Sequence, residues 1–264
     1  NTLEKSHRRI VFEEQHEQVK IDQKDRKILR VLAENSRTSF TALGKMVGLS
    51  QENVLYRVKR LQHQHLIVDF FTAIDSRKLG ILSFVVFIKF SKILRAKQET
   101  MITALLKNKH VSWVTTTAGQ FDMMLFLQAM SVYEFEKEWQ NIIKEYGHHF
   151  REMDLGIMTE YGHRPAYYPV ADLKGFAAKQ QLFPYEKEFK EAVKSPLRAE
   201  FDSKDLLILR NLLVNSRIKL TDLGKEIGMS SQNVNFRIQR MIKQGIITCF
   251  GYRPNYQKLR YQYY

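Results

Sequence analysis

The chain has 264 residues, of which 44% are hydrophobic, and a formal net charge of +14 at pH 7. The length predicts about two domains, and the apolar content is enough for ordinary globular cores. The single cysteine, Cys249, excludes an intrachain disulfide framework and a cysteine-based zinc cluster, which fits a reducing, cytoplasmic interior. The sequence has no run of about 18 apolar residues, so we expect no membrane-spanning helix.

The excess positive charge is concentrated in two segments. Residues 21–80 hold 11 Lys/Arg against 6 Asp/Glu, and residues 201–264 hold 11 against 4. These segments supply +5 and +7 of the total, whereas residues 81–170 supply only +1. Basic surfaces attract polyanions. Charge alone leaves two interpretations open, namely nucleic-acid binding and a solvated face that serves solubility.

A helical pattern begins at Asp22, where Ile28, Leu29 and Leu32 recur at the spacing of one helix face. Asp22 or Asp25 is placed to cap the N-terminus of this helix, and Asn35-Ser36 ends it. The sequence therefore predicts a helix that starts close to residue 22.

Two further helices are expected at about 39–47 and 51–64. Gly48 ends the first of them, as glycine does where a helix finishes in the left-handed region, and Ser50 caps the second. Two helices joined by such a tight turn form a helix-turn-helix. The apolar run at 67–73 predicts a strand, which would form a wing beside the helices.

The third predicted helix has one buried and one exposed face. Val54, Val58 and Leu61 fall on one stripe at about 100° per residue. On the exposed face, Arg, Asn and Gln side chains suit base edges in a major groove, and the Arg and Lys farther along suit phosphates. An ordinary amphipathic helix in a bundle would show the same stripe, so one helix alone leaves both interpretations open. The expected DNA contacts in this copy are Ser50, Gln51, Asn53, Tyr56, Arg57, Lys59 and Arg60.

The segment from Asn35 to Ile67 returns at Asn215 to Ile247, with every matched pair 180 positions apart. A repeat of this length at a fixed offset indicates a duplicated domain. Val234, Ile238 and Met241 form the buried stripe of the second copy. The repeated turn, cap and basic face favour DNA binding over simple bundle packing. The expected DNA contacts in the second copy are Ser230, Ser231, Gln232, Asn233, Phe236, Arg237, Arg240 and Lys243.

The segment between the copies follows a different pattern, with the order β-α-β-β-α-β. This order predicts a ferredoxin-like sandwich in which two helices cover one face of the sheet. The other face is apolar and free, so we expect homo-oligomerisation through this domain. The expected strands are 81–90, 111–117, 122–129 and about 149–159, and the expected helices are 96–108 and 133–146.

The end of the chain aligns with the middle of the first unit. Tyr264 matches Phe84, inside the first strand of the ferredoxin-like segment, so we expect the natural chain to continue into a second domain of that kind. The predicted fold is α+β. Its expected parts are an arm (1–20), a winged helix-turn-helix (21–74), a ferredoxin-like domain (80–160), a linker with a short helix (161–200), a second winged helix-turn-helix (201–254) and the start of a second ferredoxin-like domain (255–264).

The helical repeat carries a recognisable pattern. Asp-x-x-Asp-x-x-Ile-Leu from Asp22, followed by Asn-Ser-Arg, Leu-Gly, Gly-Leu-Ser and Val-x-x-Arg-Val-x-x-Leu, resembles the DNA-binding domain of the Lrp/AsnC (feast/famine) transcription regulators. The next unit looks like that family's effector-binding and oligomerisation domain, because Gly119-Gln120-Phe121-Asp122 matches its Gly-x-Tyr/Phe-Asp turn. The resemblance covers about 21–160 as one unit and 201–264 as the start of another. His65 departs from the pattern, since members usually carry glycine there.

The resemblance implies a sequence-specific transcription regulator that binds double-stranded DNA and responds to a small effector such as an amino acid. It places the effector near Gly119, Gln120, Phe121 and Asp122. In this interpretation Asp122 would bond an ammonium group, and backbone N–H groups of the turn would take a carboxylate. The alternative is that these residues only build a β-turn.

The sequence also bears on three other functions, namely metal binding, enzymatic activity and ligand sensing without DNA binding. The 8 histidines do not predict a metal site, because His63/His65 and His148/His149 lack helical i,i+4 spacing and a third ligand nearby; no cofactor is expected. Sirohaem decarboxylases look like this family's fold and occur as fused tandems. Their His-Asn-Tyr-type cluster is missing from Ser112 to Thr117, so we expect no enzyme. A ligand-sensing protein without DNA binding is the remaining alternative.

The two copies are not equivalent. Glu52 and His65 in the first copy match Gln232 and Gly245 in the second. A covalent tandem of unlike copies can read an asymmetric operator more readily than a symmetric dimer of single units.

Overall fold

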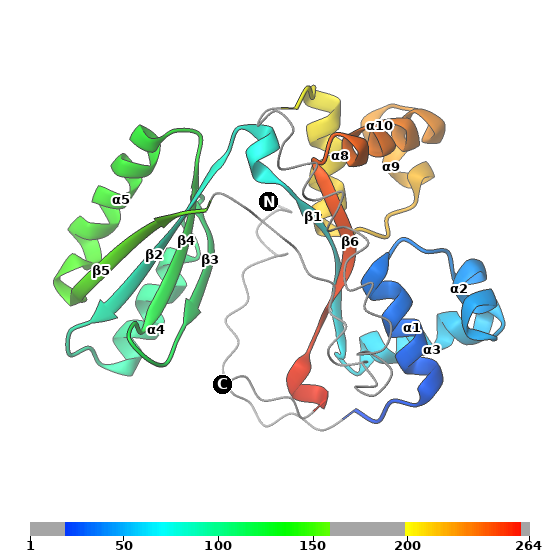
Figure 1. The fold of residues 1–264 in the computed structure, drawn as a ribbon, viewed down its shortest axis with the longest axis horizontal. Helices are drawn as coiled ribbons and strands as arrows, with labels where there is room; N and C mark the ends of the chain where they lie inside the picture. Colours follow the sequence, from blue (N-terminus) through cyan, green and yellow to red (C-terminus); the bar gives the residue numbers. More distant parts are fainter. Residues whose placement is uncertain (1–18, 159–198, 260–264) are drawn as a thin grey trace, which may run out of the picture. The chain divides into compact units, whose positions relative to one another are not determined.

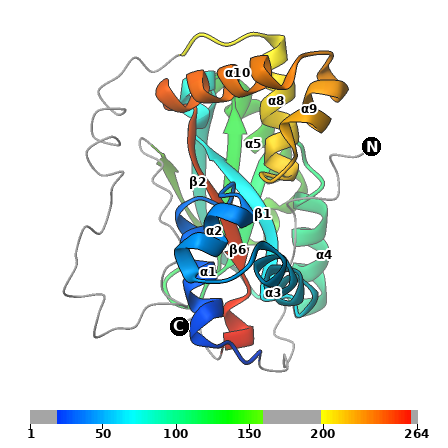
Figure 2. The ribbon, with the colours of Figure 1, turned by 90° about the vertical axis from the view of Figure 1, so that its right-hand side faces the viewer.

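The computed structural model describes residues 19–158 and 199–259 (Figures 1 and 2). These residues fall into two compact units, one built from both helical repeats and one from the segment between them. The arm up to residue 18, the linker at 159–198 with its expected short helix, and residues 260–264 lie outside the described residues. Within the described ranges, no helix is long and apolar enough to cross a membrane.

The first repeat forms three helices with the caps that the sequence predicts. The side chain of Asp22 accepts a hydrogen bond from the backbone N–H of Asp25, and that of Ser50 accepts one from Asn53. Gly48 ends the second helix in the left-handed conformation, with a φ of 68°. The helices are α1 (Gln23–Glu34), α2 (Phe40–Val47) and α3 (Gln51–His63).

The second repeat has the same plan. Asp202 and Ser230 cap its first and third helices, and Gly228 ends the second with a φ of 67°. One cap differs, because Lys219 stands where the first copy has Ser39 and makes no side-chain capping bond. The helices are α8 (Ser203–Val214), α9 (Leu220–Ile227) and α10 (Ser231–Lys243).

A second glycine in each repeat, which lies inside α2 or α9, is required by close packing. A Cβ on Gly44 would lie 2.6 Å from the carbonyl oxygen of Leu49, and one on Gly224 would lie 2.5 Å from that of Met229. Both obstacles are backbone atoms that cannot move aside without distorting the turn. Glycine therefore lets α2 approach the start of α3, and α9 the start of α10.

The strands that follow the two helical repeats pair with each other. β1 (Ile67–Ile74) and β6 (Ile247–Pro254) form an antiparallel two-stranded sheet. In both views they run side by side, with α1–α3 toward one end and α8–α10 toward the other (Figures 1 and 2). The strand predicted at 67–73 is confirmed. Its hydrogen-bonding partner is the matching strand of the other copy, which satisfies backbone groups that a single strand would leave open.

The contacts between the repeats are reciprocal. The backbone N–H of Ser36 donates to the carbonyl of Phe250 at 2.9 Å, and that of Ser216 donates to Phe70 at 3.1 Å. The hydroxyls of Ser36 and Ser216, 180 residues apart in the chain, lie 2.8 Å from each other. Each contact has a counterpart in the other copy, so an approximate two-fold axis relates the repeats.

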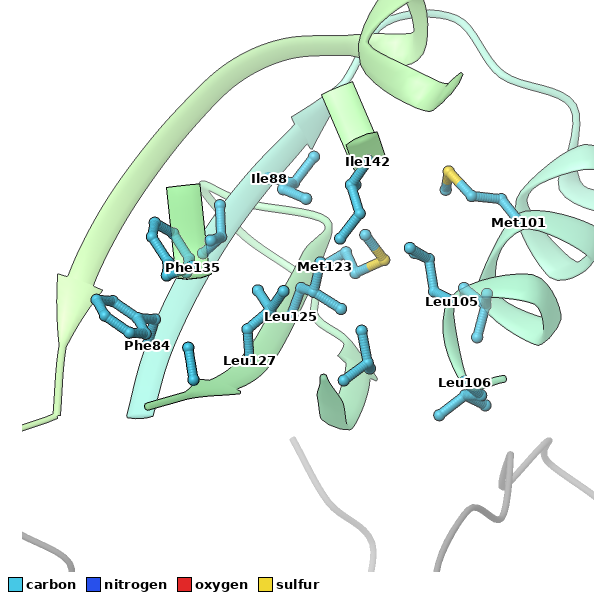
Figure 3. Packing of buried hydrophobic residues seen from close by; sticks show 14 of the residues in the cluster. Phe84, Ile88, Met101, Leu105, Leu106, Met123, Leu125, Leu127, Phe135 and Ile142 are labelled. Atoms are coloured by element: carbon cyan, nitrogen blue, oxygen red, sulfur yellow. The ribbon is translucent and has the colours of Figure 1, made fainter. Parts of the chain in front are cut away.

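The other unit is the predicted ferredoxin-like fold. Its sheet has the order β3-β4-β2-β5, and all its strand pairs are antiparallel. Figure 3 shows side chains of β2 and β4, such as Phe84 and Leu125, meeting Phe135 and Ile142 of α5 and Leu105 of α4. The elements are β2 (Leu82–Phe90), α4 (Arg95–Leu105), β3 (Val111–Thr116), β4 (Met123–Ala129), α5 (Val132–Tyr146) and β5 (Phe150–Ile157).

One helix of this unit is shorter than expected. The sequence predicts a helix up to Asn108, but α4 ends at Leu105. The side-chain oxygen of Asn108 accepts a hydrogen bond from the backbone N–H of His110 at 2.9 Å. This local bond competes with helix propagation and turns the chain toward β3.

Candidate nucleic-acid interface

The first two turns of α3 and α10 present exposed polar and aromatic side chains. Tyr56 and Phe236, which match in the repeat, are both 68% exposed. Each copy therefore presents one exposed aromatic ring at the same position of its third helix. The other predicted contacts that lie exposed are Gln51, Asn53, Lys59, Gln232, Asn233 and Lys243, while Ser231 is half-buried.

Ser50 and Ser230 are exposed but already engaged. Each hydroxyl accepts a hydrogen bond at 3.2 Å from the backbone N–H three residues later. Both serines therefore fix the start of the helix that follows the turn. They remain predicted DNA contacts, with an observed structural role.

Arg57 and Arg60 point back toward the first helix of their own repeat. Arg57 Nη1 lies 2.6 Å from Asp22 Oδ2 and 2.8 Å from Asp25 Oδ1, and Arg60 Nη2 lies 2.5 Å from Asp25 Oδ2. Asp25 is only 1% exposed. A buried carboxylate needs paired charge and hydrogen bonds, and these two arginines supply both.

The second repeat reproduces this ion cluster. Arg237 Nη1 lies 2.8 Å from Asp202 Oδ2 and 2.9 Å from Asp205 Oδ1, and Arg240 also binds Asp205. The backbone N–H of Asp205 and the guanidinium of Arg237 lower the pKa of Asp202 to about 2. DNA contact by Arg57, Arg60, Arg237 and Arg240 stays a prediction, while their observed contacts brace the third helix of each repeat against the first.

Two arginines at the approximate axis were not singled out from the sequence. Arg37 donates to the carbonyls of Ser216 and Ile218, and Arg217 donates to those of Ser36 and Thr38. The only sequence signal was their identical Asn-Ser-Arg setting in both copies. They bind backbone across the axis, so they tie one helix-turn-helix to the other.

These arginines are also packed against aromatic rings. The guanidinium of Arg37 lies 5.6 Å from the ring centre of Phe250, and that of Arg217 lies 5.4 Å from that of Phe70. Burial, followed by the charge of Arg37, lowers the pKa of Arg217 to about 10. The ring contacts and the carbonyl bonds hold both guanidinium groups in place and join the loop after α1 to the loop after α8.

The predicted effector residues form the turn between β3 and β4. Asp122 Oδ1 lies 2.8 Å from Lys89 Nζ, and Asp122 Oδ2 accepts a hydrogen bond from the backbone N–H of Phe90 at 2.9 Å. These bonds, with Lys89 as the largest contributor, lower the pKa of Asp122. Both carboxylate oxygens are therefore engaged with β2.

The rest of this turn is open. Gly119 and Gln120 are exposed, and Gly119 has a φ of 134°, which favours glycine. Lys89 also donates to the carbonyl of Gly119 at 3.2 Å, and Phe121 is half-buried with its ring 5.6 Å from that of Phe87. An ammonium group that reached Asp122 would have to replace Lys89.

No group of three or more His, Cys, Asp or Glu suited to a metal ion occurs among the residues that the structure describes. His63 and His65 are exposed at the end of α3 and just beyond it. His148 and His149 lie with their ring centres 3.9 Å apart. Their rings are tilted by 47° to each other.

Two protein-family models match the chain. An AsnC-type helix-turn-helix domain matches residues 21–62, and a winged helix-turn-helix DNA-binding domain matches residues 201–248. The proline dehydrogenase transcriptional activator of Rhizobium radiobacter is 32% identical over 124 residues, which are 46% of this chain and 79% of that protein. The similarity thus extends beyond the helix-turn-helix into the ferredoxin-like unit.

Solved structures share the fold. A transcriptional regulator from Neisseria meningitidis in complex with L-Met matches with a TM-score of 0.52 at 19% identity, over 58% of this chain and 99% of that one. The sirohaem decarboxylase NirDL, in complex with an iron-uroporphyrin III analogue, matches with a TM-score of 0.58 at 12% identity, over 88% of this chain and 66% of that one. At these identities both likenesses show the fold alone.

Proposed function

Because this chain belongs to the Lrp/AsnC family of helix-turn-helix transcription regulators, we propose that α3 and α10 bind double-stranded DNA together, as one sequence-specific unit. The observation that carries the proposal is the reciprocal pairing of the two repeats through β1, β6 and the Ser36–Ser216 contact. This pairing presents two exposed helix faces in a fixed, two-fold arrangement, which is how helix-turn-helix dimers contact successive half-sites.

The exposed side chains have distinct roles in this proposal. Asn53 and Asn233, in the first turn of each helix, contact base edges, and the exposed rings of Tyr56 and Phe236 contact apolar groups such as thymine methyls. Lys59 and Lys243 neutralise phosphates. The remaining proposed contacts, which cap the helices or line the same faces, are Ser50, Gln51, Ser230, Ser231 and Gln232.

The four arginines of the ion clusters act mainly as positioning residues in this proposal. Their guanidinium groups hold α3 and α10 against buried aspartates. The loss of one would weaken DNA binding by moving the helix as well as by removing a positive charge.

Gel-shift titration against promoter DNA at two salt concentrations tests the function. We expect affinity to fall steeply with salt, and Lys59→Ala to flatten the slope of log affinity against log salt by about one unit, since one phosphate contact is lost. Lys107→Ala, an exposed lysine of the ferredoxin-like unit, is the matched control and should leave the slope unchanged. A complex that is absent, or insensitive to salt, contradicts the proposal.

The effector site is proposed at the Gly119–Asp122 turn. An amino-acid effector would exchange its ammonium group for Lys89 at Asp122 and bond its carboxylate to backbone N–H groups of the turn. The Neisseria meningitidis regulator was crystallised with L-Met, so L-methionine is a reasonable first probe. Calorimetric titration should show binding that Asp122→Asn removes and Gln120→Ala largely retains; equal binding by wild type and Asp122→Asn would contradict this site.

We further propose homo-oligomerisation through the ferredoxin-like unit. This unit exposes Trp113 on β3 and Met153, Leu155 and Ile157 on β5, with exposed fractions of 45–59%. Exposed apolar side chains of this size suit an interface. Light scattering should show an oligomer that Trp113→Glu or Leu155→Glu shifts toward the monomer, and a wild-type monomer at high concentration would contradict this part of the proposal.

A non-enzymatic, cytoplasmic role completes the proposal. The shared fold with a sirohaem decarboxylase does not supply its chemistry, and the β3 segment from Ser112 to Thr116 carries no histidine. Cytoplasmic placement follows from action on chromosomal DNA. Absorbance titration with an iron tetrapyrrole should show no tight binding; a tight complex would instead support the enzymatic alternative.

A further inference from the structure

The two repeats are unlike at the centre of the sheet that joins them. Phe71 of β1 pairs with Gly251 of β6, and these residues match each other in the repeat. A Cβ on Gly251 would lie 2.8 Å from Phe71 Cζ. The phenylalanine ring therefore occupies the space that a side chain at 251 would need, and glycine in a strand marks such a close approach.

This complementarity disfavours pairs of like copies. Two first copies would oppose Phe71 with a second Phe71, and overpacking of this kind is destabilising. Two second copies would oppose glycine with glycine and leave a void where the ring lies. Only a pair of one first copy and one second copy places a single phenylalanine ring in this space.

The next matched pair shows the same preference. Thr72 of β1 is buried and donates to the carbonyl of Leu212 in the second repeat at 2.8 Å. Its counterpart Tyr252 is 2% exposed and belongs to the hydrophobic core of the first repeat. The first repeat therefore accommodates a tyrosine from β6, whereas the second accommodates a threonine from β1. The spaces that receive these two side chains differ in size.

The exposed faces of α3 and α10 differ, although the residues that hold these two helices in position are the same. The two ion clusters, the serines that cap α3 and α10, and the turn glycines are identical in both copies. Most positions that are exposed on α3 and α10 carry different residues in the two copies. The unlike exposed pairs are Glu52 and Gln232, Tyr56 and Phe236, Lys59 and Gln239, Gln62 and Ile242, and His63 and Lys243.

Glu52 and Gln232 have the clearest difference in base preference. Both are exposed in the first turn, directly before the shared asparagines Asn53 and Asn233. A glutamate carboxylate only accepts hydrogen bonds, which suits the N4 amino group of cytosine, whereas a glutamine amide both donates and accepts, which suits adenine N7 and N6. The shared asparagines also suit adenine and predict a position common to both half-sites.

We propose that the two repeats form an obligate pair of unlike copies within one chain, and that this pair reads an operator with two different half-sites, in which Glu52 faces cytosine and Gln232 faces adenine. The inference rests on the proposed function, that α3 and α10 bind DNA together. It adds the reason for the duplication, because a homodimer of either copy alone would present two identical faces.

Selection of the full chain on random duplex DNA tests the operator. We expect an enriched motif with two unlike halves, bound at least about tenfold more tightly than either palindrome made from one half, since a wrong base at one good contact typically costs about 1–3 kcal/mol. Enrichment of a palindrome overturns this inference and leaves the proposed function standing. Enrichment of no sequence at all means that the proposed function has failed as well.

Two exchanges test the residue assignment in the same assay. Glu52→Gln should shift one position of one half-site from cytosine toward adenine, and Gln232→Glu should produce the opposite shift in the other half-site. Glu226→Gln, an exposed glutamate of α9, is the matched control and should leave the motif unchanged. An unchanged motif with Glu52→Gln and Gln232→Glu overturns the assignment.

A size exchange tests the obligate pairing without DNA. Gly251→Phe should lower the melting temperature of the helical unit, because two large rings then compete for one space. Adding Phe71→Gly to that variant should restore most of the loss, since the ring and the space have only changed strands. A tolerated Gly251→Phe, or a double variant no more stable than the single one, overturns the pairing.

Discussion

At the matched positions 65 and 245 the two copies adopt the same backbone conformation with different side chains. His65 has a φ of 56° and its counterpart Gly245 a φ of 72°. The left-handed region costs a residue with a Cβ about 1–2 kcal/mol, whereas glycine enters it readily. The first copy therefore carries strain that the second copy lacks.

Replacement of His65 by glycine should stabilise the helical unit by up to about 1 kcal/mol, because relief of strain outweighs the greater freedom of glycine in the unfolded chain. Urea denaturation would measure the gain. Gly245→His is the reciprocal variant and should lose stability. A less stable His65→Gly protein would show that the imidazole makes a contact worth more than the strain.

Asp202 gives the protein a defined sensitivity to acid. Its pKa is lowered from 3.8 to about 2 by the backbone N–H of Asp205 and by Arg237. A carboxylate with a depressed pKa stabilises the fold above its unfolded pKa, and this contribution disappears as the pH falls through the folded pKa. The window for Asp202 therefore runs from about pH 4 down to about pH 2.

We expect the urea midpoint of the wild type to fall in this window more steeply than that of Asp202→Asn, which has no carboxylate to protonate there. Asp154→Asn removes an exposed carboxylate of the ferredoxin-like unit and serves as the control. Parallel curves for wild type and Asp202→Asn would mean that the observed bonds do not persist in solution.

Helices α1 and α3 are held together by charge as well as by apolar packing. Asp25 lies at the centre of this contact, buried and bonded to Arg57 and Arg60. A buried carboxylate with two guanidinium partners orients one helix relative to the other, which apolar contacts alone specify less sharply. When one partner of a buried ion pair is removed, the charge of the other partner remains uncompensated.

Asp25→Ala should destabilise the helical unit by about 3–5 kcal/mol and should weaken DNA binding in parallel. Thermal melts and gel shifts on the same preparations would measure both effects. Arg30→Ala, which removes an exposed side chain from the same helix with an ion pair of 3.9 Å, should cost well under about 1 kcal/mol. A similar cost for the two variants would place the cluster among ordinary surface ion pairs.

The two repeats are expected to unfold as one cooperative body. Arg37 and Arg217 bind carbonyls across the approximate axis, and Tyr252 of the second copy fills the core of the first. Hydrophobic and polar contacts thus cross between segments about 180 residues apart. A cooperative unit of this kind loses protection from exchange throughout when one crossing contact is removed.

Arg37→Ala should raise amide hydrogen exchange in α1–α3 and in α8–α10 to similar extents, because the bonds it loses join the two repeats. Exchange in α4 and α5 should stay unchanged and provides the internal control. Faster exchange confined to the first repeat would show that the repeats are independent folding units.

Much of the local structure follows from short stretches of sequence. The caps at Asp22 and Ser50, the left-handed Gly48 and the buried stripes on the third helices depend on residues within a few positions of each other. The β-α-β-β-α-β order of the middle segment was predictable for the same reason. Local spacing decides where helices and strands begin and end.

The roles of polar side chains were less predictable. The helical spacing of Arg57 and Arg60 placed them on or beside the exposed face of α3, and charge suggested DNA. Their carboxylate partners lie more than thirty residues earlier in the chain, at Asp22 and Asp25. A sequence pattern shows which face of a helix is polar, but not whether another element of the protein or an external ligand meets that face.

By itself, the sequence determined the duplication, the helix-turn-helix in each copy, the ferredoxin-like order between them and the family to which the chain belongs. Tertiary structure alone decided that β1 and β6 pair with each other, that Phe71 fits over Gly251, and that Arg37 and Arg217 cross the axis. The physical reason is the range of the interactions. Helix caps and periodicity are set by near neighbours, whereas strand partners and interlocking side chains are chosen by packing between residues far apart in the chain.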